Sequence, residues 1–202
     1  MVHIGSENPW LAMWSEPRTT ISALVQKRPT YGVFYLATIY ILQNFFFYFN
    51  WWSLGLSSYY GIILFTCVVL SPLVGFLWLY YLGFIYYLMG RCLKGRAPAI
   101  HLRTAIAWSN IPYSISLIMW FVLILMDPEN SFVHDPGAQS FVFINLISFI
   151  LEVWAFVLLV QAIREVQQFS ALRSIANVAL SSSVSAVFLF LVFSAFRYFF
   201  IS

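Results

Sequence analysis

The chain has 202 residues, of which 62% are hydrophobic, 20% aromatic and only 8% charged. A water-soluble domain usually has about 25% charged residues, so this composition excludes a soluble globular protein and indicates that lipid surrounds most of the chain. The net charge of +3 comes from bases scattered in short loops. This pattern favours membrane lipids as partners and excludes nucleic acid.

The first segment, 1–30, is expected to lie in the cytoplasm and to carry a helix on the membrane surface. Ile21, Leu24 and Val25 fall on one side of a helix that starts at Pro17, where proline is favoured. Bases on both sides of this apolar face can reach lipid headgroups. The pattern predicts an amphipathic helix on the inner leaflet, and an ordinary solvated helix is the alternative.

Five apolar runs follow, and about 20 apolar residues suffice to cross the hydrocarbon region of a bilayer. The second run is interpreted as one long helix kinked at Pro72, because two spans would need about 40 residues and a turn. The fold class is therefore all-α, an integral membrane bundle of five transmembrane helices with an N-terminal interfacial amphipathic helix. The transmembrane domain covers residues 31–202, with spans at 31–49, 59–89, 104–126, 140–163 and 175–201.

The basic residues predict how the bundle is oriented. If there are five spans, the bases of the N-terminal segment, the loop 90–103 and the loop 164–174 all lie on one side. The loop 127–139 has acids and no base. Cytoplasmic loops are enriched in Lys and Arg, so we expect the N-terminus in the cytoplasm and the C-terminus outside.

The loop 90–103 is also a candidate lipid-binding site. Bases near an anionic leaflet each contribute about 1 kcal/mol to binding. A role in orientation alone is the alternative interpretation. The candidate headgroup-binding residues are Arg91, Lys94, Arg96 and Arg103.

Glu152 is the one acid inside an expected span, about midway along 140–163. A charge at the bilayer centre costs about 2.5–3.5 kcal/mol on insertion scales, so we expect polar partners around it. Three interpretations are open: a neutral carboxyl that joins helices, a proton or cation site in a transport path, or an oligomer contact. The predicted polar seam joins the first, fourth and fifth spans through Gln43, Asn44, Asn145, Ser148, Glu152, Asn177, Ser181 and Ser185.

Pro112 interrupts the third expected span. Its ring should kink the helix and free a backbone carbonyl, which Asn110 or Ser109 could satisfy. A packing kink and a gating hinge are the two interpretations.

Three segments of the chain carry recognisable motifs. The first is NPWLAMWSEPRTTI at 8–21, with KRP at 27–29. The second is GRCLKGR at 90–96, followed by LRTAIAWSNIP at 102–112. The third is EVQQFS at 165–170. Their order and spacing extend over nearly the whole chain, and together they resemble bacterial members of the Yip (Ypt-interacting protein) domain family.

The resemblance implies a five-helix membrane domain with a cytoplasmic N-terminus. Eukaryotic relatives bind Rab-type GTPases and one another in early secretory traffic, through a long N-terminal region. Only about 30 residues precede the first expected span here, so GTPase binding is not expected. The bacterial cytoplasmic membrane is the expected location, and the eukaryotic endoplasmic reticulum or Golgi membrane is the alternative.

The sequence predicts no enzyme, because catalytic motifs, metal-ligand spacings and phosphate-binding loops are not found in it. No cofactor or metal is expected. The leading hypothesis is a non-catalytic membrane protein that organises membrane or binds lipids and partner proteins, either in a homo-oligomer or with other membrane proteins. The alternative is a small transporter, channel or lipid-flipping protein with a polar site around Glu152.

Overall fold

The structure, a computed structural model, describes residues 8–135 and 139–200. Within these residues no strand occurs, so the expected all-α class is confirmed there. Residues 1–7 of the expected N-terminal segment and Ile201 of the last expected span lie outside the described residues. In chain order the elements are α1 (Pro9–Ser15), α2 (Pro17–Lys27), α3 (Val33–Trp51), η1 (Leu54–Leu56), α4 (Tyr60–Cys92), α5 (Ala99–Ser109), α6 (Tyr113–Met126), α7 (Gln139–Gln167) and α8 (Ala171–Phe200).

Three helices are long and apolar enough to cross a membrane: α4, α7 over Val142–Gln167, and α8 over Ala171–Val192. The pair α5 and α6 meets the same test as one broken span, which raises the number to up to four. Helix α3 has 19 residues, but it contains Gln43, Asn44 and Asn50 and is not among these helices. The expectation of five spans therefore stays a prediction.

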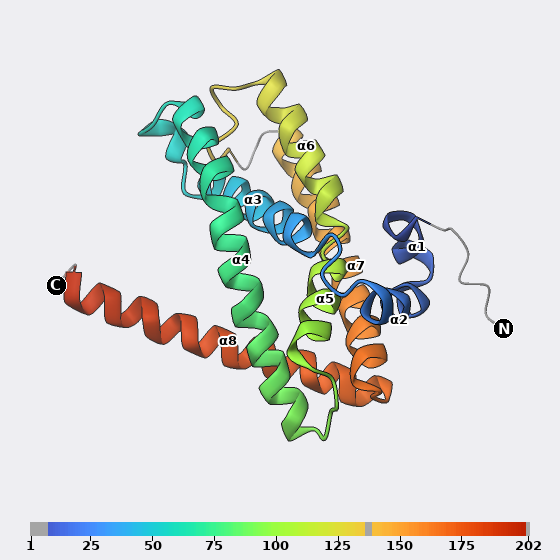
Figure 1. The fold of residues 1–202 in the computed structure, drawn as a ribbon. Helices are drawn as coiled ribbons and strands as arrows, with labels where there is room; N and C mark the ends of the chain where they lie inside the picture. Colours follow the sequence, from blue (N-terminus) through green and yellow to red (C-terminus); the bar gives the residue numbers. More distant parts are fainter. Residues whose placement is uncertain (1–7, 136–138, 201–202) are drawn as a thin grey trace.

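Helix α4 is the longest helix that the structure describes, and α3, α5 and α8 pack on it. It runs for 33 residues without a break and passes through Pro72. Gly75 brings it close to α3, since a Cβ at this position would lie 2.7 Å from the Ala37 carbonyl oxygen. Small residues allow this close approach between membrane helices. Helix α3 therefore packs directly on α4 (Figure 1).

The third expected span is two helices, not one kinked helix over 104–126. α5 begins at Ala99 and ends at Ser109, and α6 starts at Tyr113 at an angle of 45°. Because Pro112 cannot continue an α-helix, the chain turns at this point. The Ile111 N–H donates to the carbonyl of Trp108 at 3.3 Å, which satisfies the group that a simple kink would have freed.

The N-terminal helices pack on the protein. Asn8 caps α1 by accepting a hydrogen bond from the Trp10 N–H at 3.1 Å, and Pro17 begins α2. Ile21 and Leu24 are buried against the rest of the chain, with α2 resting on α5 and α7. The expected helix therefore exists, but its apolar face contacts protein rather than lipid.

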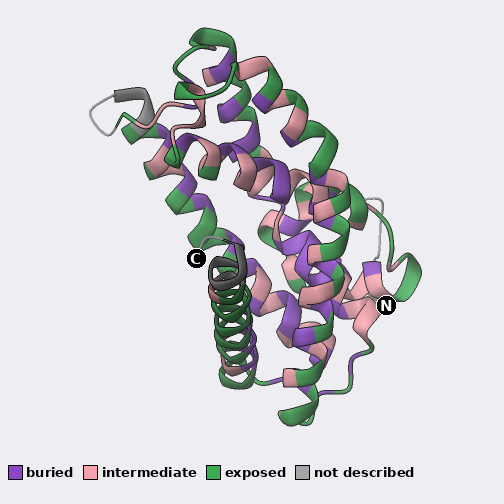
Figure 2. Cartoon of the chain, turned by 90° about the vertical axis from the view of Figure 1, so that its left-hand side faces the viewer, coloured by how far each residue is buried: buried purple, intermediate pink, exposed green. Residues whose placement is uncertain are grey.

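The described residues form two apolar cores. One is centred on Trp108 and includes residues of α1, α2, α4, α5 and α7. The other is centred on Phe46, Trp120 and Phe132, near the opposite end of α4. Figure 2 shows buried residues where these helices meet and exposed residues along most of α8.

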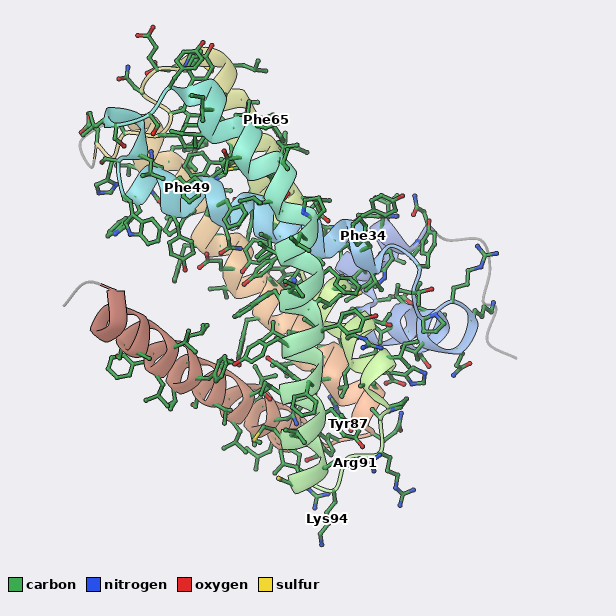
Figure 3. The ribbon with its side chains drawn as sticks, turned by 60° about the vertical axis from the view of Figure 1, so that its left-hand side comes forward. Phe34, Phe49, Phe65, Tyr87, Arg91 and Lys94 are labelled. Carbon is green, nitrogen blue, oxygen red and sulfur yellow. The ribbon has the colours of Figure 1, made fainter. Side chains whose placement is uncertain are left out.

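Helix α8 leaves the bundle at a steep angle to α4. Its first half packs on α4 and α7, and its second half leads away from the other helices (Figures 1 and 3). From Val187 to Val192 the side chains are apolar and exposed. Lipid or another protein must cover such a surface.

Candidate functional site

Trp108 joins the first motif segment to the second. This fully buried side chain donates from Nε1 to the Tyr31 carbonyl at 2.9 Å, and its ring lies 5.2 Å from that of Trp10. One turn earlier, the Thr104 hydroxyl donates to the Pro29 carbonyl. Segments 8–29 and 102–112, which are far apart in sequence, therefore form one packed unit.

The third segment is joined to the other two by polar contacts. Glu165 pairs with Arg18 of α2, with 2.9 Å between Nη2 and Oε2. Gln167, which is 3% exposed, accepts a hydrogen bond from the Ala97 N–H at 3.1 Å. The three motif segments thus pack together in the half of the molecule that holds the C-terminal end of α4 (Figure 1), and we call this meeting point the motif hub.

Two glycines make room for Gln167. A Cβ on Gly90 would lie 2.1 Å from its Nε2 atom, and a Cβ on Gly95 would lie 2.2 Å from its Oε1 atom. Distances this short exclude any side chain at either position while Gln167 stays in place. The loop after α4 is therefore held against the end of α7 by a side chain clamped between two glycines.

The bases after α4 lie at this same end. Arg91, Lys94 and Arg96 are exposed, and Figure 3 shows Arg91 and Lys94 projecting from the end of α4. The Arg91 guanidinium lies over the Tyr87 ring, 5.0 Å from its centre. Arg103 is separate from this group, because it packs over the Tyr80 ring at 4.1 Å on the side of α4.

A chain of polar side chains crosses the other half of the bundle. Gln43 of α3 donates from Nε2 to the Ser116 hydroxyl of α6 at 3.3 Å. The hydroxyls of Ser116 and Ser148 of α7 lie 3.0 Å apart. All three side chains are buried, so a polar layer joins three helices inside an apolar core.

Glu152 lies one turn further along α7 than Ser148. It is exposed and forms no ion pair with any residue that the structure describes. Tyr40 of α3 and Tyr113 of α6, whose ring centres lie 5.0 Å apart, each lie three residues from a member of the polar layer, on the same side of that layer as Glu152. An unpaired acid on a spanning helix is costly, by about 2.5–3.5 kcal/mol at the bilayer centre on insertion scales.

The Yip1 domain family model matches residues 11–194, which include the motif hub, both cores and most of α8. The chain belongs to the Yip1 domain family. With its long apolar helices, this makes it an integral membrane protein. No curated protein and no solved structure matches the chain.

The expected seam residues lie in two separate regions of the structure. Gln43 and Ser148 belong to the hydrogen-bonded layer, and half-buried Asn145 lies on α7, three residues before Ser148. Asn44 donates to the Tyr40 carbonyl of its own helix at 2.7 Å. The seam residues of α8 lie elsewhere.

The second region is where α8 crosses α4. Asn177 is fully buried, and its Nδ2 atom lies 3.5 Å from the Tyr86 carbonyl oxygen. Ser181 and Ser185 are buried on the same face of α8. Asn177 also lies beside Gly90, so this region adjoins the motif hub rather than Glu152.

Several residues that make these contacts could not be identified from the sequence. Ser116 gives no signal, because single serines are common in apolar helices. Tyr40 and Tyr113 gave no reason to be singled out among 12 tyrosines. Gln167 lies in the third motif, but nothing in the sequence relates it to Gly90 and Gly95.

Proposed function

We propose that this Yip1 domain protein is a non-catalytic membrane organiser that binds anionic lipid headgroups with Arg91, Lys94 and Arg96. The observation that carries the proposal is their exposure at the end of a membrane-spanning helix. Arg91 lies in the last turn of α4, and Lys94 and Arg96 lie on the following loop, which the Gln167 clamp fixes. Each base near an anionic surface contributes about 1 kcal/mol. No acid lies between Gly90 and Arg103 to offset them.

The orientation belongs to the same proposal. Since bases favour the cytoplasmic side, the motif hub and this loop would face the cytoplasm, in a bacterial cytoplasmic membrane. The contact of Arg91 with Tyr87 supports an interfacial position, because long basic side chains lie along apolar surface while their charge reaches headgroups. Arg103 contributes less, as it is turned toward α4.

The test compares lipid retention by the purified protein after reconstitution with equal amounts of phosphatidylglycerol and phosphatidylcholine. Co-purifying lipid is measured by mass spectrometry for wild type and for Lys94→Gln with Arg96→Gln. Two lost bases should weaken phosphatidylglycerol binding by about 2 kcal/mol, or roughly 30-fold.

The matched control removes Lys27 and Arg28, two exposed bases at the end of α2, by the same change to glutamine. A site on the loop predicts a smaller loss for the control pair. Equal losses for the two pairs would mean diffuse attraction without a headgroup site and would contradict the proposal.

Protein partners, whether a second copy or another membrane protein, would contact α8. Its outward side presents the small residues Ala179, Ser182, Ser183 and Ala186, all exposed, and small residues favour close helix contacts in membranes. This surface continues into the apolar half of α8 that leaves the bundle.

A second candidate function is transport of an ion or lipid past Glu152. The observation that favours it is an exposed acid on α7, one of the helices able to span a membrane. Flux of protons, cations and labelled lipid through proteoliposomes tests it. Flux that is present in wild type and lost in a well-folded Glu152→Gln variant would favour transport over the organising function.

A further inference from the structure

Tyr40, Tyr113 and Glu152 lie at one level of the bundle. Contacts of Gln43 with Ser116 and of Tyr40 with Tyr113 show that α3 and α6 run in the same direction, with corresponding residues side by side. Tyr40 and Tyr113 each lie three residues before a member of the polar layer. Because α7 returns in the opposite direction, the matching position is four residues after Ser148, which is Glu152.

The two tyrosine rings form a corner at the level of Glu152. Their centres lie 5.0 Å apart and their planes meet at 79°. The corner therefore combines an anionic group with aromatic rings and phenol oxygens.

This site opens toward lipid. Glu152 is exposed, and so are Phe149 and Phe156, which lie three residues before it and four residues after it on the same side of α7. A ligand would reach the carboxylate from the lipid side, with its apolar part against these two phenylalanines.

The chemistry of the corner selects one class of ligand. Carboxylates attract cations, and aromatic rings bind ammonium groups through their faces. A divalent metal ion would need several oxygen ligands, whereas the described residues contain no group of three or more His, Cys, Asp or Glu able to hold one. An ammonium with an apolar tail satisfies the acid, the rings and the flanking phenylalanines together.

We propose that Glu152, Tyr40 and Tyr113 form a membrane-facing site that binds the organic ammonium group of an amphiphile. This site is separate from the basic loop and goes beyond the headgroup-binding function. It also differs from transport, because a bound ammonium need not cross the membrane.

The first test uses the wild-type full chain in maltoside micelles, which contain no ammonium. Dicyclohexylcarbodiimide modifies carboxyl groups in apolar surroundings, and mass spectrometry measures its attachment to Glu152. Dodecyltrimethylammonium should protect Glu152, whereas a neutral probe with carbon in place of nitrogen should not. Equal modification with and without the ammonium would overturn the proposal.

The second test measures saturable binding of tritiated dodecyltrimethylammonium. Glu152→Gln should weaken binding about tenfold or more, as expected for a lost charge pairing, and Tyr40→Leu about two- to fivefold. Glu129→Gln removes an exposed acid in the loop after α6 and should leave binding unchanged. Wild-type affinity in Glu152→Gln would overturn the proposal.

A third variant separates this site from the headgroup site. Lys94→Gln with Arg96→Gln should keep full ammonium binding even where it loses anionic lipid. Loss of ammonium binding in this variant, with Glu152 intact, would place the ligand at the basic loop and reject the site at Glu152.

Discussion

Trp108 and Trp120 are both almost fully buried, at 0% and 1% exposure, but they use their indole groups differently. The Trp108 N–H donates to the Tyr31 carbonyl, whereas the Trp120 N–H has no acceptor among the described residues. A pair of identical substitutions can therefore separate the contribution of a hydrogen bond from that of packing.

We expect Trp108→Phe to lower the free energy of unfolding more than Trp120→Phe does. Both changes leave a void, but only the first removes a hydrogen bond, which contributes about 0.5–1.5 kcal/mol. Thermal unfolding of the two variants in the same detergent gives the difference. Equal losses would mean that the Tyr31 hydrogen bond does not stabilise the motif hub.

At the scale of elements, the Gln167 clamp joins the loop after α4 to the end of α7. Gly95→Ala should lower stability by about 1–3 kcal/mol, because the new Cβ displaces a side chain in a packed site. Gln167→Ala should remove the nearer obstacle and leave the Phe169 ring, 2.8 Å from the new Cβ. The double variant should therefore be more stable than the sum of the single losses predicts. Thermal unfolding of all four proteins measures this coupling, and strict additivity would contradict the clamp.

Helices that follow from one strong local pattern could be predicted from the sequence. Helix ends and helix partners that depend on tertiary contacts could not. The continuous apolar run at 59–89 predicted a single helix, and α4 is one. Pro112 predicted a disturbance, but whether a proline kinks or ends a helix depends on the donors nearby, here the Ile111 N–H. The apolar face of α2 was correctly located, but composition does not distinguish a lipid partner from a protein partner.

The candidate site could be predicted only in part. Glu152, Gln43 and Ser148 stand out as polar residues in apolar runs, and two of these three lie in the hydrogen-bonded layer. Tyr40 and Tyr113 could not be recognised, because their importance comes from the register between α3, α6 and α7. That register is set by side-chain packing between helices and leaves no local pattern in sequence.

At the scale of the whole molecule, bases are the more numerous charges at one end and acids at the other. The bases of the loop after α4 lie at the motif hub, whereas Asp127 and Glu129 follow α6 at the opposite end. If the motif hub faces the cytoplasm, a membrane-impermeant maleimide should label exposed Cys92 only after cells are permeabilised. Cys67 is buried and serves as an unreactive background.

The converse substitution completes the topology test. A variant with Ser57→Cys and Cys92→Ser carries its exposed thiol at the other end of the molecule. Ser57 is exposed and lies between α3 and α4. This variant should be labelled in intact cells. Labelling of native Cys92 in intact cells would reverse the orientation assigned here.

The motif hub also has a consequence for the order in which the protein is made. Arg18 and its partner Glu165 are 147 residues apart, an interval of roughly 7–30 s at a synthesis rate of about 5–20 residues per second. Throughout that time Ile21 and Leu24 have no finished protein surface to pack against. We expect the nascent α2 to rest on the inner leaflet until α7 is inserted. Its apolar face would then contact lipid during synthesis and protein in the folded state.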